Sequence, residues 1–404
     1  MIVDNLGRLV WFIKDRYPRD FKVQHLRGEP VLTWWEGEIV LGHGVGEYVI
    51  FDDSYREVTR VQAGNGYRGD LHEFSITPRG TVLLMAYNAV PTNLVRVGGT
   101  EDGAVWDGIA QELDIETGEV LFEWHSLEHV ALEESYYRLS GDPENPFDYF
   151  HINSIDEDYD DNLLISARNT STVYKIDRKT GAIIWRLGGR KSDFEMGPGT
   201  PFAYQHDARR QRDGTITIFD NGADPKVHEQ SRGIALKLDM TKMRATLVRE
   251  YTHPNKLLAT SQGNAQVLPN GDVFIGWGSV PFFSEFSHDG TLLFDARFTP
   301  EHESYRTFRF PWVGRPVDRP AAAVEQGPDD KVTIYTSWNG ATEVESWQVL
   351  AGPSPDQLRP VGSAPWDGFE TAIAVRTTEP YVGVRAKDRS GRVLGTSKAV
   401  NLGS

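Results

Sequence analysis

The chain contains no cysteine among its 404 residues. This absence excludes disulfide bonds, thiolate metal sites and a cysteine nucleophile. No uninterrupted apolar run approaches the length needed to cross a membrane, so we expect no membrane span. The first residues read IVDNLGRLVWF, which predicts a strand, a turn and a second strand rather than a signal peptide. Any catalysis must therefore use side chains other than cysteine.

Basic residues are in deficit, with 42 Lys and Arg against 58 Asp and Glu, a formal net charge of −16. An acidic surface repels nucleic acid and anionic lipid, so we expect neither as a partner. Hydrophobic residues make up 39% of the chain and charged residues 25%, which is typical of a globular protein. The length is sufficient for two domains.

Helical periodicity is nearly absent, and short alternating segments predict an all-β protein. One repeated pattern is an apolar stretch, a turn containing aspartate and a second strand. Its markers are Asp4, Asp53, Asp114, Asp177, Asp239 and Asp289, at spacings of 49, 61, 63, 62 and 50 residues.

Three histidines, His72, His151 and His206, each begin a second kind of repeated segment. The segments read LHEFSITPRGTVLLMAYN, FHINSIDEDYDDNLLISARN and QHDARRQRDGTITIFDN, and QGNAQVLPNGDVFIGWGS repeats the pattern with Asn264 near the histidine position. Two strands from each pattern make a four-stranded unit, and six such units predict a six-bladed β-propeller over residues 1–314. The remaining histidines, His43 among them, recur in no frame and are assigned no role.

After Trp312 the composition changes to a proline- and alanine-rich linker, VGRPVDRPAAAV. Short alternating strands follow, and their spacing predicts an immunoglobulin- or fibronectin III-like β-sandwich over residues 315–404. We find no cluster of catalytic residue types in this second domain.

The first strand of a propeller blade lies innermost, so the recurring polar positions should converge on a central funnel. The side chains expected there are His72, Tyr87 and Asn88 from the second unit, His151, Asn153, Arg168 and Asn169 from the third, His206, Asp220, Asn221 and Arg232 from the fourth, and Gln262, Asn264 and Trp277 from the fifth. Arginine suits an oxyanion, and histidine can transfer protons or act as a nucleophile. The expected partner is a small aromatic or anionic molecule. For His72 a structural role is favoured, Asp220 and Asn221 also fit a turn, and Arg232 also fits the surface.

The third-unit segment FHINSIDEDYDDNLLISARNTSTVYKIDRKTGAIIWRLGG, followed by FAYQHDARRQRDGTITIFDNG, SRGIALKLD and SQGNAQVLPNGDVFIGWG, resembles the arylsulfotransferase family. The resemblance covers about residues 1–312 and continues into the sandwich, as in the actinobacterial-type branch. It implies a six-bladed propeller that moves a sulfuryl group from an aryl sulfate to a phenol through a sulfohistidine, with neither the nucleotide donor PAPS nor a metal or other cofactor. It further implies that His151 and His206 stabilise the transferring group and that Arg232 holds its oxygens. Members of this family are often exported.

The resemblance is incomplete at one position, because TSQGNAQVLPNGDVFIGWG has no histidine where well-known bacterial members carry their nucleophile. Gln262 and Asn264 occupy that region. Either His206 or His151 takes the nucleophile's role, or the chemistry differs. Three alternatives therefore stay open: a lyase, cyclase or hydrolase with His151 and His206 as acid and base; a metalloenzyme with His72, His151 and His206 as ligands; and a binding module without catalysis. The sequence does not specify an oligomeric state.

Overall fold

The fold is taken from a computed structural model, which describes residues 1–14, 16–140, 142, 145–299 and 301–403. Strands account for 49% and helices for 3% of the chain, so the all-β expectation is confirmed. The chain forms two compact units. The larger comprises Tyr17–Ile50 and Thr59–Phe310, and the smaller comprises Met1–Arg16, Phe51–Val58 and Pro311–Ser404. Within the described residues, no helix combines the length and apolar character needed to span a membrane.

In the described part of the larger unit, antiparallel strands follow one another in groups of four. The first group is β3 (Arg19–Leu26), β4 (Glu29–Val40), β5 (His43–Phe51) and β6 (Glu57–Val61); the second is β7 (Gly69–Ile76), β8 (Thr81–Thr92), β9 (Gly103–Asp114) and β10 (Val120–His125); the third is β11 (Ile152–Glu157), β12 (Leu163–Ala167), β13 (Thr172–Ile176) and β14 (Ile183–Gly188). The fourth is β16 (His206–Arg210), β17 (Ile216–Asp220), β18 (Arg232–Asp239) and β19 (Arg244–Thr252), and the fifth is β20 (Asn264–Val267), β21 (Val273–Gly276), β22 (Phe282–Phe286) and β23 (Leu292–Arg297).

The groups are joined by a few further elements. The first two groups share one sheet, because β5 pairs with β7 between Gly46 and Gly69. The short strand β15 (Glu195–Met196) adds to β19 in parallel. The helical segments are η1 (Val95–Val97), α1 (Ser126–His129) and η2 (Leu132–Glu134).

Two marker aspartates of the repeated pattern, Asp177 and Asp114, form the turns of outer hairpins, whereas between β5 and β6 the neighbouring Asp52 makes the turn bonds instead of Asp53. Between β13 and β14, Asp177 Oδ1 accepts the backbone N–H groups of Lys179 and Thr180, at 3.0 and 2.8 Å. Gly181 then adopts a φ of 74°, a left-handed conformation that glycine reaches without a steric cost. Asp114 makes the equivalent bonds between β9 and β10. These local bonds fix the register of each outer hairpin.

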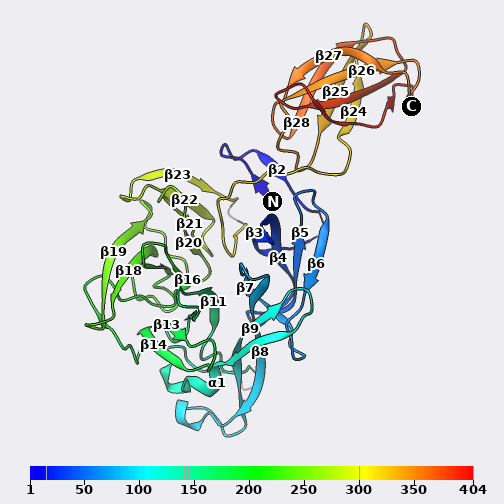
Figure 1. The fold of residues 1–404 in the computed structure, drawn as a ribbon. Helices are drawn as coiled ribbons and strands as arrows, with labels where there is room; N and C mark the ends of the chain where they lie inside the picture. Colours follow the sequence, from blue (N-terminus) through cyan, green and yellow to red (C-terminus); the bar gives the residue numbers. More distant parts are fainter. Residues whose placement is uncertain (15, 141, 143–144, 300, 404) are drawn as a thin grey trace. The chain divides into compact units, whose positions relative to one another are not determined.

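The first strands of the groups are neighbours at the centre of the larger unit. β3 contacts β7, β7 contacts β11, β11 contacts β16 and β16 contacts β20. Figure 1 shows these strands around a shared centre, with later strands of each group, such as β14, β19 and β23, farther out. A residue at the start of a first strand is therefore placed toward this centre, and the candidate site is built from such residues.

A buried group of charged side chains ties the first strands together. We call Asp20, Lys22, Glu73, Asp207, Arg209 and Arg306 the central ion network. Lys22 Nζ lies 2.7 Å from Asp20 and 3.0 Å from Glu73, and Arg306 lies 3.1 Å from Asp20 and 3.4 Å from Glu73. Arg209 pairs with Glu73 and, at 2.8 Å, with Asp207. Because its members come from β3, β7, β16 and the segment after β23, the network joins strands that are distant in the sequence.

The carboxyl group of Asp156 on β11 lies beside this network and should make stability depend on pH. Burial raises its pKa to about 6 from 3.8, although Arg209 and the N–H of Arg210 oppose the rise. The folded chain therefore holds a proton that the unfolded chain has released, so between these two pKa values stability falls as pH rises. We expect Asp156→Asn to remove this slope and to raise the free energy of unfolding near neutral pH by about 1–3 kcal/mol.

Urea unfolding of both proteins at about pH 5 and about pH 8 checks this prediction. In wild type the Arg210 N–H lies 2.7 Å from the Asp156 carboxylate, and the asparagine amide oxygen of the variant can still accept this hydrogen bond. Wild type should gain stability relative to Asp156→Asn at the lower pH. A constant difference between the two proteins would contradict the raised pKa.

The smaller unit contains two antiparallel sheets and an amino-terminal hairpin. The hairpin is β1 (Ile2–Val3) and β2 (Leu9–Trp11). One sheet has the order β24 (Ala321–Gln326), β25 (Lys331–Ser337) and β28 (Glu370–Arg376); the other has the order β27 (Arg359–Pro365), β26 (Ser346–Gly352), β29 (Tyr381–Lys387) and β30 (Val393–Thr396), with β31 (Val400–Asn401) also paired to β29. Ile334, Trp347, Ile373 and Val384 share one buried core, which draws on both sheets.

Tyr55 binds three separate segments of the smaller unit. Its ring stacks on Trp11, with centroids 5.1 Å apart and planes at 12°. Its hydroxyl donates to the Gly340 carbonyl at 2.8 Å and accepts from the indole N–H of Trp312 at 2.9 Å. A side chain at Gly340 would meet the Tyr55 ring, since a Cβ atom there would lie 2.2 Å from it. The contact explains why segments far apart in sequence belong to one unit.

Candidate functional site

Three histidines gather at the start of β5, on β7 and just before β11. We call His43, His72 and His151 the histidine cluster. The ring centroids of His72 and His151 are 4.9 Å apart, and those of His43 and His151 are 5.5 Å apart. Tyr87 lies 4.0 Å from His43, and Tyr305 lies 5.3 Å from His72, both between ring centroids. The structure therefore brings His72 and His151 together and adds His43, to which the sequence analysis assigned no role.

Asp70 orients His72. Its Oδ1 accepts the Nδ1–H of His72 and also the His72 backbone N–H at 2.9 Å. The other oxygen accepts the backbone N–H of Gly44, which follows His43. Burial raises the pKa of Asp70, but His72 and these hydrogen bonds bring it below its ordinary value. With Nδ1 bound to a carboxylate, Nε2 is the ring nitrogen that His72 can offer to a ligand.

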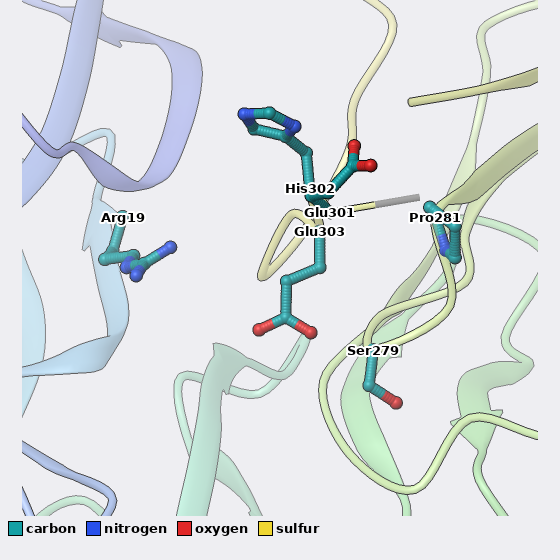
Figure 2. A pocket seen from close by; sticks show the side chains of 6 residues that line it. All are labelled: Arg19, Ser279, Pro281, Glu301, His302 and Glu303. Carbon is teal, nitrogen blue, oxygen red and sulfur yellow. The ribbon is translucent and has the colours of Figure 1, made fainter. Parts of the chain in front are cut away.

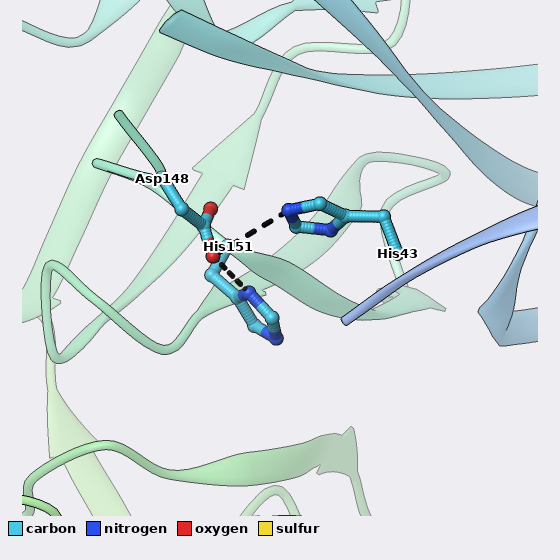
Figure 3. A group of neighbouring side chains, drawn as sticks. All are labelled: His43, Asp148 and His151. Carbon is cyan, nitrogen blue, oxygen red and sulfur yellow. Dashed lines mark hydrogen bonds and ion pairs between the residues drawn. The ribbon is translucent and has the colours of Figure 1, made fainter. Parts of the chain in front are cut away.

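Asp148 binds His151 in a similar way. Its Oδ2 accepts the Nδ1–H of His151 at 2.6 Å, as Figure 3 shows. Burial lowers the pKa of His151 well below its ordinary value, and the nearby charges of His72 and Arg168 lower it further. The imidazole is therefore neutral, and its Nε2 carries a free lone pair. A neutral histidine with an oriented ring can act as a nucleophile or a base.

His43 is buried and has no hydrogen-bond partner among the described residues. Its side chain is 2% exposed, and both ring nitrogens are unpaired. Nε2 lies 3.7 Å from Asp148 Oδ2. Burial lowers the pKa of His43 to about 4, although Asp148 opposes this shift. One ligand atom each from His43, Asp148 and His151 lies within 4.8 Å of the others, so these three side chains could hold a metal ion.

His206 is the first residue of β16, and both of its ring nitrogens bind protein groups. Nδ1–H donates to Asn221 Oδ1 at 2.8 Å, and Nε2 accepts the backbone N–H of Gln262 at 3.2 Å. Asn221 Nδ2 in turn donates to the Gln262 carbonyl at 3.0 Å. Burial and the charge of Arg168 lower the pKa of His206 well below its ordinary value. His206 is thus a neutral imidazole held between Asn221 and Gln262.

Arg232 and Asp220 form a separate pair near the end of β17. Arg232 Nε donates to Asp220 at 2.8 Å, while its terminal nitrogens donate to Glu250 at 2.7 Å and to the Pro201 carbonyl at 2.8 Å. All three guanidinium nitrogens therefore bind groups of the protein. Burial raises the pKa of Asp220, and the charge of Arg232 opposes the rise.

Arg168 is the cation whose charge acts on both His151 and His206. It donates to Asn169 Oδ1 at 2.8 Å and to the Thr260 carbonyl at 3.2 Å, and its guanidinium lies 5.2 Å from the centroid of the Tyr204 ring. Asp224 lies 3.5 Å from a terminal nitrogen of Arg168, and the charge of Arg168 also opposes the rise that burial causes in the pKa of Asp148. Such a group favours a bound anion.

The other expected site residues have the following contacts. Asn153 Nδ2 donates to the Gln205 carbonyl at 2.7 Å, Asn169 Nδ2 to the Asp148 carbonyl at 2.5 Å, and Tyr87 to the Ile152 carbonyl at 2.7 Å. Asn264 exchanges two hydrogen bonds of 2.9 Å with the backbone of Thr307, Gln262 Nε2 donates to Glu303 at 3.2 Å, and Asn88 is exposed. Trp277 is fully buried, packs on Phe219 and His253, and donates to Ser284 at 2.9 Å.

A polar cavity of about 380 Å³ lies in the larger unit near residues 301–303. Its lining residues are Arg19, Ser279, Pro281, Glu301, His302 and Glu303 (Figure 2). Because Glu303 accepts a hydrogen bond from Gln262, the cavity adjoins the residue whose backbone binds His206.

Three polar groups of the site were not expected from the sequence: His43, Asp70 and Asp148. Asp70 and Asp148 precede recurring histidines by two and three residues, and that short spacing was the available signal. His43 lies in the segment GHGVG on a third strand, outside the frame of the repeats. Gly44, which follows His43, allows close packing, since a Cβ atom there would lie 2.6 Å from the backbone of Leu71.

Comparison with known proteins places the chain in a family. No curated protein matches it. Similar solved structures include a catalytically inactive virginiamycin B lyase from Staphylococcus aureus with quinupristin, which is 10% identical, covers 98% of each chain and has a TM-score of 0.39. A protein of unknown function from Bacteroides caccae is 14% identical over 73% of this chain and 81% of the other, with a TM-score of 0.37. A luciferin-regenerating enzyme is 10% identical over 82% and 88% of the two chains, with a TM-score of 0.42. The family model for arylsulfotransferase (ASST) matches residues 22–299, which is more than half of the chain, and the chain therefore belongs to the arylsulfotransferase family.

Proposed function

We propose that this protein transfers a sulfuryl group from an aryl sulfate to a phenolic acceptor, without PAPS, at the histidine cluster. One observation carries the proposal: His72 and His151 lie 4.9 Å apart between ring centroids, and each binds a carboxylate through Nδ1. Nε2 of each oriented imidazole is therefore available for reaction. Membership of the arylsulfotransferase family supports the reaction class.

In the proposed first half-reaction, His151 is the nucleophile. Its Nε2 lone pair forms a bond to sulfur, and the bond between sulfur and the aryl oxygen breaks. Protonated His72 gives its Nε2 proton to the leaving phenolate, which departs as a phenol. The sulfohistidine keeps its Nδ1–H on Asp148, and this carboxylate stabilises the positive charge that develops on the ring.

The second half-reaction returns the chain to its starting state. The acceptor phenol gives its proton to neutral His72 Nε2 while its oxygen attacks sulfur. The bond between nitrogen and sulfur breaks, which restores neutral His151 and protonated His72. The acceptor leaves as an aryl sulfate, so atoms and charges balance over the cycle.

We assign the charge that stabilises the sulfuryl oxygens to Arg168. Its charge acts on both His151 and His206, and a fixed cation in a site of low exposure favours an anionic transition state. The family pattern suggests Arg232 for this role. Arg232 would first have to release Asp220, Glu250 or Pro201, so in our proposal it positions Asp220 and the neighbouring Asn221, which binds His206.

We also propose that residues 1–314 form a six-bladed propeller, followed by an immunoglobulin- or fibronectin III-like sandwich over residues 315–404, as in the actinobacterial-type branch. In this proposal residues 1–16 and 51–58 belong to the propeller, although they group with the smaller compact unit. The recurrent four-stranded groups support the propeller. The backbone of Thr307 and Arg309 binds the side chains of Asn264 and Gln266 beside β20, which supports a closing segment after β23. The core shared by the sheets of β25 and β26 supports the sandwich.

The test is release of 4-nitrophenol from 4-nitrophenyl sulfate by the full chain, with and without a panel of phenols. We expect release that depends on the acceptor and formation of the sulfated acceptor in equal amount. Incubation with donor alone should leave a sulfuryl adduct on the peptide that contains His151, detected by mass spectrometry. No release with any acceptor, or an adduct on another residue, would contradict the proposal.

A further inference from the structure

His43 and Asp148, which face each other, carry three buried polar atoms without hydrogen-bond partners among the described residues. Both ring nitrogens of His43 lack a hydrogen-bond partner among the described residues, and so does Asp148 Oδ1. His43 is 2% exposed, so bulk water does not solvate its ring. Buried polar atoms normally have partners, so unpaired ones mark a place where a bound ion, water or ligand can supply the missing contact. Figure 3 shows the His43 ring and the Asp148 carboxylate directed toward each other.

The spacing of these atoms fits a single metal ion. His43 Nε2 lies 3.7 Å and His151 Nδ1 lies 2.6 Å from Asp148 Oδ2. With metal–ligand bonds of about 2.0–2.2 Å, tetrahedral ligand atoms are about 3.4 Å apart. The distance from His43 is near this value, whereas the hydrogen bond between His151 and Asp148 has to lengthen when an ion takes the place of its proton. The centroids of two imidazoles on one such ion would be about 5.2 Å apart. The centroids of His43 and His151 are 5.5 Å apart.

Neighbouring groups hold these side chains in place. Tyr87 and Trp106 flank the His43 ring, at 4.0 and 4.9 Å between centroids. The side chains of Asp148 and His151 keep 18% and 14% exposure, which gives an ion access to the site. His72 remains outside this set because its Nδ1 binds Asp70. Such surrounding contacts fix the orientation of metal ligands.

We propose that His43, Asp148 and His151 bind one divalent transition metal ion of the zinc and iron class. Two imidazoles and one carboxylate are a ligand set that Zn²⁺ and Fe²⁺ prefer, and three protein ligands leave a position for water or a substrate oxygen. The ion replaces the proton between His151 Nδ1 and Asp148. The set differs from the three imidazoles considered from the sequence, because both nitrogens of His206 already bind protein groups.

This site goes beyond the proposed sulfuryl transfer and does not rest on it. The ion takes the place of the Nδ1 proton of His151 that the proposed reaction keeps on Asp148, so sulfuryl transfer is measured on the metal-free chain. Metal binding and sulfuryl transfer are also measured separately, since metal content is determined without any substrate. A chain that binds no metal but transfers sulfuryl groups overturns only this inference, and a chain that binds metal without transfer contradicts only the proposed function.

The test measures metal content of the full chain after chelator treatment, loading with Zn²⁺ or, under anaerobic conditions, Fe²⁺, and gel filtration. We expect one ion per chain in wild type and at least about a 100-fold weaker affinity in His43→Gln and Asp148→Asn. Circular dichroism checks that each variant is folded. Should either variant unfold, Co²⁺ loading of wild type decides, because imidazole and carboxylate ligands give Co²⁺ a visible absorption spectrum distinct from that of the hydrated ion.

Two control variants test whether metal binding depends on the proposed ligands rather than on any buried histidine. His253→Gln removes another buried histidine, which lies 3.0 Å from Asp295 and outside the cluster. His72→Gln removes the cluster histidine that is not a proposed ligand. Both should keep one ion per chain. Less than about a tenth of an ion in wild type, or equal loss in His43→Gln and either control, would overturn the inference.

Discussion

Replacing Arg306 by methionine is expected to lower the free energy of unfolding by about 3–5 kcal/mol. The Arg306 side chain has no exposed surface and lies 3.1 Å from Asp20 and 3.4 Å from Glu73. It also donates to the Asn153 carbonyl at 2.9 Å. Methionine fills similar volume but leaves two buried carboxylates with less compensation. Burial raises the pKa of Glu73, and Arg209, Lys22 and Arg306 bring it below its ordinary range, so losing Arg306 weakens this stabilisation of the ionised group.

Urea unfolding of wild type and variants measures the effect. Arg244→Met is the matched control, because Arg244 lies 3.7 Å from Glu195 and both side chains are largely exposed. It should cost less than about 1 kcal/mol. The double variant Arg306→Met/Glu73→Gln should recover part of the loss, because it removes a carboxylate that the single variant leaves unpaired. Equal costs for Arg306→Met and Arg244→Met would show that the network does not hold the first strands together.

The sequence was sufficient to predict strand-rich repeats and the approach of His72 to His151. His72 lies on the first strand of the second group and His151 just before the first strand of the third, and similar positions in repeated units lie at similar depths. His43 was missed because it lies on a third strand, where the pairing of β5 with β7 brings it to the cluster. That pairing is a long-range contact, which local periodicity does not encode.

The central ion network could not be predicted from the sequence either. A period of two shows which residues share a face of a strand, but not whether that face meets solvent or other strands. Asp20, Lys22 and Arg306 are charged residues of a kind usually exposed, yet all three are buried because opposite charges from several strands meet there. The same ambiguity applies to Trp277. A tryptophan after a hydrophobic strand fits a funnel wall, whereas its indole packs in the core beside Phe219.

Replacing His151 by alanine is expected to lower kcat/KM for sulfuryl transfer by at least about 10⁴-fold, because it removes the proposed nucleophile. Asp148→Asn should cost about 10²–10⁴-fold, mainly in kcat. An asparagine oxygen can still accept the Nδ1–H of His151, but it cannot neutralise the charge on a sulfohistidine. His206→Ala should cost about 10–100-fold, because both nitrogens of His206 bind protein groups and its role is to position Asn221 and Gln262.

Steady-state rates with 4-nitrophenyl sulfate and a phenol measure these losses, and added imidazole separates nucleophilic loss from structural damage. Imidazole can enter the space left by His151→Ala and accept the sulfuryl group there, so it should restore part of the rate in this variant. The same addition should do little for His206→Ala, whose missing ring binds backbone and amide groups rather than sulfur. Rescue of His206→Ala but not of His151→Ala would move the nucleophile to His206. That outcome would also require His206 to release the Gln262 N–H during turnover, because only then would Nε2 have a free lone pair.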